Sequence, residues 1–152
     1  MSLNWCLVMN NTLVKLTKRI EELERALERD ALTGAYNRNF FYGNLNLKPY
    51  ISGRLYFIDL DGFKKINDSR GHVYGDQVLT RFAFDLTMCL SNTDLLIRYA
   101  GDEFIIVTAK KRLRLSSNLS FSCGSVKICN NTTKDELLET ADKRMYRNKN
   151  KC

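Results

Sequence analysis

The sequence predicts an α+β domain with a mostly antiparallel sheet flanked by helices, preceded by an amphipathic helix. Two observations predict the sheet: residues 95–109 (LLIRYAGDEFIIVTA) place two apolar runs around a glycine-containing turn, and residues 55–60 form a third apolar run. A third observation predicts the helices, because apolar residues recur every three or four positions at 6–27 and again at 78–90. Strands and helices in this mixed order are typical of α+β folds.

Residues 1–29 are predicted to form a helical stalk. Its apolar residues occupy the a and d positions of a coiled coil, and they are Cys6, Met9, Leu13, Leu16, Ile20, Leu23 and Leu27. Two interpretations are equally open: a coiled coil that pairs two chains, or an amphipathic helix folded against its own domain. The pattern stops at Gly34, so the globular domain is predicted to occupy residues 30–152.

The remaining elements are predicted in chain order from periodicity and turn residues. They are a short helix at 37–47 before Pro49, a strand at 55–60, a helix at 78–90, a hairpin of 95–99 and 104–108, a strand at 119–129 and a last helix at 134–146.

The segment 110–118 connects the hairpin to the next strand. In a ferredoxin-like arrangement these two strands lie on opposite sides of the first strand, so the connection has to cover roughly 22 Å. Its nine residues reach about 30 Å when extended but only about 14 Å as a helix. We therefore predict an extended crossover without a helix, which leaves part of one sheet face less covered.

Composition limits the class of protein. The chain has 152 residues, which suits one domain with an appended helix, and its net charge of +7 favours an anionic partner such as a nucleotide, a nucleic acid or an anionic membrane. The apolar run at 5–9 is far shorter than the ~20 residues that span a bilayer, so no direct membrane insertion is expected.

The cysteine and histidine content argues against a zinc site. The five cysteines form no C-x-x-C pair, and His72 is the only histidine. Free thiols in a reducing, cytoplasmic compartment fit this usage best.

Two acidic clusters suggest chemistry. Asp59 ends one predicted strand, and Asp102 and Glu103 lie at the turn of the hairpin. If these strands are neighbours, the three carboxylates converge, and oxygen-only ligation of this kind suits Mg²⁺ or Mn²⁺ in phosphoryl or nucleotidyl transfer. The alternative is an acidic hairpin tip that is merely solvated.

Asn67 and Asp76 lie between the two clusters. A carboxylate accepts from the N1–H and N2–H₂ groups of guanine and an amide complements its acceptors, so this pair could select a purine base. Either residue alone is more often a helix cap than a base-binding residue.

These motifs together resemble the GGDEF family of diguanylate cyclases. The resemblance rests on residues 59–76 (DLDGFKKINDSRGHVYGD) and 98–104 (RYAGDEF), supported by 30–38 (DALTGAYNR) and 141–149 (ADKRMYRNK). It runs from residue 30 to the end of the chain. It implies a ferredoxin-like, palm-type fold that condenses two GTP into cyclic di-GMP and two pyrophosphates across a homodimer, under an upstream sensor that this chain does not include.

The resemblance also implies roles for single residues. The implied metal ligands are Asp59, the Leu60 carbonyl, Asp102 and Glu103, with Glu103 alternatively the base that activates the 3′-hydroxyl. The implied substrate-binding residues are Phe63 and Gly101 through their backbone, Lys64 and Lys149 on phosphates, and Asn67 and Asp76 on guanine.

The chain departs from the family pattern in several places: the 110–118 segment is shorter, the arginine expected four residues after Lys149 is not present, and two further departures lie at or near the signature. Ala100 replaces the first glycine of the signature, and Ser91 stands where the arginine of an R-x-x-D product site is expected, so no allosteric product site is predicted. Two alternative functions remain open besides the cyclase. One is a degenerate GTP-binding regulatory domain, and the other is a palm-like relative that binds nucleic acid. The second is disfavoured because no strand interleaves aromatic and basic residues, and no nucleic-acid partner is expected.

Overall fold

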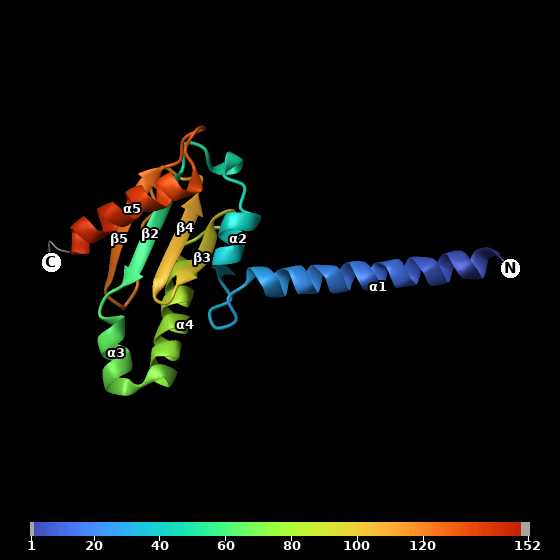
Figure 1. The fold of residues 1–152 in the computed structure, drawn as a ribbon, viewed down its shortest axis with the longest axis horizontal. Coiled ribbons are helices and arrows are strands. Elements are labelled where there is room, and N and C mark those ends of the chain that lie inside the picture. Colours follow the sequence, from blue (N-terminus) through green and yellow to red (C-terminus); the bar gives the residue numbers. More distant parts are fainter. Residues whose placement is uncertain (1, 150–152) are drawn as a thin grey trace.

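The structure is a computed structural model that describes residues 2–149, with side chains described for all of these except 2–8, 11 and 25. Helix α1 (Ser2–Glu28) projects away from the sheet domain that holds the rest of the chain (Figure 1). Its described apolar residues are about half exposed, and they include Met9, Leu13, Leu16, Ile20, Leu23 and Leu27. The stripe therefore does not pack on its own domain, which rules out the second interpretation of the helix. The heptad position Cys6 lies outside the described side chains.

The predicted α+β architecture is confirmed. Five strands form one sheet in the order β1-β3-β4-β2-β5. They are β1 (Tyr36–Asn37), β2 (Arg54–Leu60), β3 (Leu95–Ala100), β4 (Glu103–Thr108) and β5 (Phe121–Lys127). Only β1 and β3 pair in parallel, and every other pair is antiparallel.

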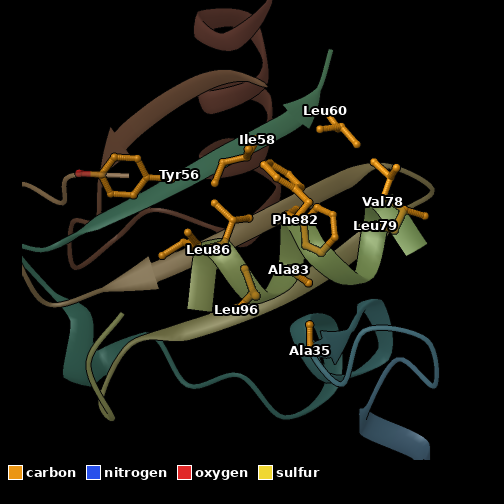
Figure 2. Packing of buried hydrophobic residues seen from close by; sticks show 12 residues of the cluster. Ala35, Tyr56, Ile58, Leu60, Val78, Leu79, Phe82, Ala83, Leu86 and Leu96 are labelled. Carbon is orange, nitrogen blue, oxygen red and sulfur yellow. The ribbon is translucent and has the colours of Figure 1, made fainter. Parts of the chain in front are cut away.

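Helices cover both faces of the sheet. They are α2 (Arg38–Gly43), the 3₁₀ turn η1 (Lys48–Tyr50), α3 (Phe63–Arg70), α4 (His72–Met88) and α5 (Lys134–Lys149). Because side chains alternate along β2, Ile58 packs with Phe82 of α4, whereas Phe57 packs with Leu137 of α5 in a second cluster. Figure 2 shows the first cluster, in which Phe82 and Leu86 of α4 lie among side chains from the strands, such as Ile58 and Leu96.

Sequence patterning misses three elements: α3, β1 and the 3₁₀ turn η1. Helix α3 buries no residue fully, so it lacks the apolar stripe by which a helix is found. In the structure α3 directly follows β2 and pairs with α4 at the end of the sheet where β2 ends (Figure 1). Strand β1 is only two residues long.

The crossover prediction is confirmed. No helix forms between β4 and β5, which flank β2 on opposite sides. Leu113, Leu115 and Leu119 of this extended segment pack against the α4 cluster, and the Leu113 N–H donates to the Tyr56 hydroxyl at 2.9 Å. The segment itself thus covers Tyr56. Whether this face of the sheet is less covered than in relatives is not tested and stays a prediction. Any less covered area would lie along β5, where Phe121 and Cys123 are only half-buried.

Candidate nucleotide and metal site

The predicted acidic residues meet at one end of the sheet. Strands β2 and β4 are neighbours, and their register places Asp59 directly opposite Glu103. The Leu60 N–H donates to the backbone carbonyl of Asp102 at 3.3 Å, which ties the hairpin turn to the end of β2. Directly opposite residues in an antiparallel pair share one face of the sheet. The convergence expected from the sequence is therefore present in the fold.

Arg98 fixes the turn that carries Asp102. Its guanidinium donates to the Gly101 carbonyl at 2.9 and 2.8 Å and forms an ion pair with Asp30 at 3.1 Å. Asp30 in turn accepts from the backbone and hydroxyl of Thr33. Gly101 has φ +27°, in the region that favours glycine. One arginine thus joins the start of the domain to the candidate site, a role that sequence reasoning did not assign.

The carboxylates at this end repel one another. Burial raises the pKa of Asp102, and the negative charge of Asp59 raises it further, against opposing effects of its backbone hydrogen bond, Lys149 and Arg98. Burial also raises the pKa of Glu103, with further contributions from Asp59, Asp102 and Asp142. Asp142 on α5 is a fourth acid beside the site that the sequence analysis quoted only within a motif. The cluster as a whole favours binding a cation.

Lys149 supplies that cation in the structure. Its ammonium forms an ion pair with Asp59, and the hydrogen bond with Asp59 raises the pKa of Lys149. Asp61, two residues later, is engaged elsewhere, since it accepts from the hydroxyls of Ser120 at 2.9 Å and Ser122 at 2.7 Å. Lys149 therefore lies beside the carboxylates rather than apart from them, within reach of either a carboxylate or a phosphate.

The donor set fits a magnesium-type ion without forming a finished cage. Among the described residues, no group of three or more acidic, cysteine or histidine side chains is already arranged to hold a metal. Carboxylates with raised pKa values nevertheless lack enough positive charge from the protein. Mg²⁺ and Mn²⁺ are usually held by one or two carboxylates together with waters and substrate phosphates, so a partial donor set of this kind suits them.

The start of α3 offers a phosphate site next to the acids. Phe63 is the first residue of α3, just beyond the end of β2, and Gly62 at the cap provides no side-chain hydrogen bond. The first N–H groups of a helix have no partner within it, and they attract anions. Lys64 is exposed in the same turn. Both predicted phosphate-binding features of this segment thus lie beside Asp59.

Asn67 and Asp76 differ in their access to solvent. Asp76 is exposed and lines a hollow of about 670 Å³ together with Leu32, Val73 and Phe84. The Asn67 Oδ1 atom is instead buried and has no hydrogen-bond partner in the described structure. A Cβ placed on Gly75 would lie 1.9 Å from this oxygen, so only glycine leaves room for the amide. An orphaned buried acceptor is unusual in a folded protein and is typical of a functional position.

Ser91 and Asp94 form a closed turn at the far end of β3. The Asp94 carboxylate accepts from the Ser91 backbone at 2.8 Å and hydroxyl at 2.7 Å, and it pairs with Lys110 at 2.9 Å. Burial alone would raise the pKa of Asp94, but hydrogen bonding to Thr108, Lys110 and Ser91 outweighs it and lowers this pKa to about 2.

Comparison with known proteins identifies relatives for most of the chain. The family model for the diguanylate cyclase GGDEF domain matches residues 27–120. Diguanylate cyclase DgcM of Escherichia coli K12 is 35% identical over 159 residues, an alignment that covers 88% of this chain and 39% of DgcM. Response regulator PleD of Caulobacter vibrioides is 39% identical over 94 residues, covering 56% of this chain and 21% of PleD. The chain thus spans well under half the length of these relatives.

Solved structures share the fold. The coiled coil and GGDEF domain of DgcB from Caulobacter crescentus, in complex with c-di-GMP, superposes with a TM-score of 0.79 at 23% identity, covering 99% of this chain and 96% of that one. The GGDEF domain of PA1120 from Pseudomonas aeruginosa matches at 29% identity with a TM-score of 0.66, covering 82% and 90% of the two chains. No helix in the described part of the chain is long and apolar enough to cross a membrane.

Proposed function

Because the chain belongs to the GGDEF family of diguanylate cyclase domains, we propose that it condenses two GTP into cyclic di-GMP and two pyrophosphates. The observation that carries the proposal is the convergence of Asp59, Asp102 and Glu103 beside Lys149 and the start of α3. These groups supply donors for a metal and for phosphates at one place, as nucleotidyl transfer requires.

Each residue has a proposed task. Asp59, the Leu60 carbonyl and Asp102 hold Mg²⁺ or Mn²⁺, which when bound neutralises phosphate charge and polarises the reacting phosphoryl group. Glu103 completes the donor set or takes the proton of the attacking 3′-hydroxyl, a task that its raised pKa favours. Lys64, Lys149, Gly101 and the N–H groups near Phe63 orient the phosphates, and Asn67 and Asp76 bind guanine.

Turnover requires two copies, because each presents one GTP to the other. The exposed stripe of α1 can pair them: Ile20 at an a position and Leu23 at a d position favour two-stranded coiled coils. In a parallel, in-register pair, Arg19 at g faces Glu24 at e of the partner helix, five residues further on, with opposite charge. The sequence of α1 thus favours a parallel homodimer that brings two half-sites together.

A GTP-binding regulatory domain without turnover is the second candidate. One observation favours it: the Lys149 ammonium occupies Asp59, which is a proposed metal ligand. A domain of this kind would bind GTP and act through its coiled coil on a partner.

The deciding experiment is an incubation of the protein with GTP and Mg²⁺, followed by chromatographic separation of the products. A cyclase yields cyclic di-GMP and pyrophosphate in a 1:2 ratio, and the initial rate rises more steeply than linearly with protein concentration. GTP binding without product would favour the regulatory domain, and absence of GTP binding would contradict both.

Base selection has its own test. Asp76→Ala should weaken GTP binding relative to ATP, and Gly75→Ala should do the same by displacing the Asn67 amide. Glu139→Ala, which removes an exposed acid on α5 outside the hollow that Asp76 lines, is the control. Equal loss of both nucleotides in Asp76→Ala would contradict a role in reading the base.

A further inference from the structure

The acidic residues of the chain are segregated in the sequence. Residues 31–58 and 104–134 contain no aspartate or glutamate. The same stretches carry nine basic residues, which are Arg38, Lys48, Arg54, Lys110, Lys111, Arg112, Arg114, Lys127 and Lys134. Because the fold brings parts of these two stretches together, the separation along the chain becomes a separation in space.

Several of these basic residues lie at the end of the sheet opposite the carboxylates, whereas Arg38 lies over the ring of Tyr99, near the acidic turn. Strand β2 begins with Arg54 where β4 and β5 end (Figure 1). Arg54 lies directly opposite Lys127 of β5, and its guanidinium donates to the Lys111 carbonyl at 2.8 Å and to the Ser125 hydroxyl at 3.1 Å. Like charges directly opposite on neighbouring strands destabilise a sheet. An anion bound beside Arg54 and Lys127 would therefore reduce their mutual repulsion.

The crossover adds further positive charge to this end. Leu113 and Leu115 are packed inward, whereas Lys111, Arg112 and Arg114 are exposed. None of these three, nor Lys127, forms an ion pair with any residue that the structure describes. Two acids that contact this part of the chain are already engaged: Asp94 pairs with Lys110, and Asp85 accepts from the Ser117 hydroxyl. We call Arg54, Lys111, Arg112, Arg114 and Lys127 the basic end.

From these contacts we propose that the basic end docks on an anionic lipid surface. The hollows beside Asp76, Ser91, Asp85 and Asp61 are all lined by residues other than these five, and the five side chains lie on strand ends and on an exposed crossover, as on a broad surface. No exposed aromatic side chain accompanies them, which disfavours stacking with single-stranded nucleic acid. Ile51, shortly before β2, is 40% exposed at the same end and can enter the interface. The inference is independent of the proposed cyclase activity.

Vesicle sedimentation with the full chain tests the docking. The protein should co-sediment with phosphatidylcholine vesicles that contain phosphatidylglycerol, should not sediment with pure phosphatidylcholine vesicles, and should be released by high salt. One Lys or Arg near such a surface contributes roughly fivefold to partitioning, so the triple variant Lys111→Gln, Arg112→Gln, Arg114→Gln should bind about 100-fold more weakly.

A second triple variant controls for net charge. Lys18→Gln, Lys65→Gln and Lys143→Gln remove the same charge from exposed sites elsewhere, and binding should fall far less. Equal melting temperatures show that both variants are folded. Three outcomes overturn the proposal: binding that ignores phosphatidylglycerol, as an apolar α1 contact would; equal loss in both triples; or duplex DNA that displaces the protein at matched phosphate concentration.

Discussion

The two ends of β2 carry opposite charge and treat it differently. Near the end of β2, Asp59 lies directly opposite Glu103 and close enough to Asp102 to raise its pKa. The ammonium of Lys149 forms an ion pair with Asp59 and partly neutralises this negative charge. At the start of β2, Arg54 lies directly opposite Lys127, and neither residue forms an ion pair with a described acid. Both ends break the rule that like charges are kept apart across strands. Such departures are common where a protein binds a ligand. The two ends differ in that the acidic end contains its own counterion, Lys149, whereas the basic end contains none among the described residues.

The largest expected effect concerns Asp102. Asp102→Asn should lower the rate of cyclic di-GMP formation by roughly 10²–10³-fold or more, because the negative charge of a proposed metal ligand is lost. The same variant should melt at a slightly higher temperature than the native protein without metal, since removing one of several repelling carboxylates relieves strain. Product chromatography and thermal melting measure the two effects. Unchanged turnover in the folded variant would remove Asp102 from the site.

Near the basic end, substitution of Asp94 is expected to lower the stability of the fold. The side chain of Asp94 is 1% exposed and holds Ser91 and Lys110, so Asp94→Ala breaks a buried charge network. We expect a cost of about 2 kcal/mol, because Lys110 is itself 45% exposed and its pairing is screened. The melting temperature should fall by about 4–8 °C. Lys110→Met should cost clearly less, and the reverse order would mean that the ion pair outweighs the turn hydrogen bonds.

The contrast between the ends was only partly predictable from the sequence. The strands, the hairpin and the extended crossover follow from local patterns: apolar runs, a glycine turn and the reach of nine residues. The meeting of Asp59 with Asp102 and Glu103 follows from strand adjacency, which the fold class supplies. The pairing of Arg54 with Lys127 depends on register between strands far apart in the chain, which no local pattern encodes.

Side-chain choices within the site were beyond sequence reasoning for the same reason. Arg98 reaches Asp30 across 68 positions, and Lys149 reaches Asp59 across 90. The burial of the Asn67 oxygen against Gly75 depends on how α3 packs on α4, and α3 itself has no apolar stripe to reveal it. The sequence can therefore suggest these residues as candidates. Only the packed structure shows which of them are exposed to solvent, which are hydrogen-bonded and which are buried.

A third prediction tests the built-in counterion. Lys149→Met should bind Mn²⁺ roughly 3–10-fold more tightly in the absence of nucleotide, because the metal no longer competes with an ammonium for Asp59. The same variant should bind GTP more weakly, since a phosphate contact is lost. Calorimetric titration measures both affinities, and Lys143→Met on the same helix is the control. Weaker metal binding by Lys149→Met would contradict competition at Asp59.

A smaller effect is expected from pH. The pKa values of Asp102 and Glu103 are raised on folding, so the folded state holds more protons than the unfolded state between the two values, and the free energy of unfolding falls as the pH rises through that window. The metal-free protein should therefore gain roughly 1–3 °C in melting temperature on going from pH 7 to pH 5. Asp30 and Asp94, whose pKa values are lowered, act in the opposite sense and only at lower pH.

Glu103→Gln isolates this contribution. The variant should show a shallower dependence of melting temperature on pH than the native protein, and saturating Mg²⁺ should flatten the native curve in the same way. A native protein whose stability rises steadily from pH 5 to pH 7 without metal would argue that the carboxylates are not mutually strained.

The last expected effect is the absence of one. Asp94, the acid at the basic end, is occupied by Ser91 and Lys110, and no arginine stands at position 91 to hold a second nucleotide phosphate. Added cyclic di-GMP at micromolar levels should therefore leave the initial rate of GTP turnover unchanged. Ser91→Arg should introduce at most weak inhibition, because Lys110 still competes for the Asp94 carboxylate. Potent non-competitive inhibition of the native protein would show that cyclic di-GMP binds at another site, and Arg54 and Lys127 would be the first residues to substitute in locating it.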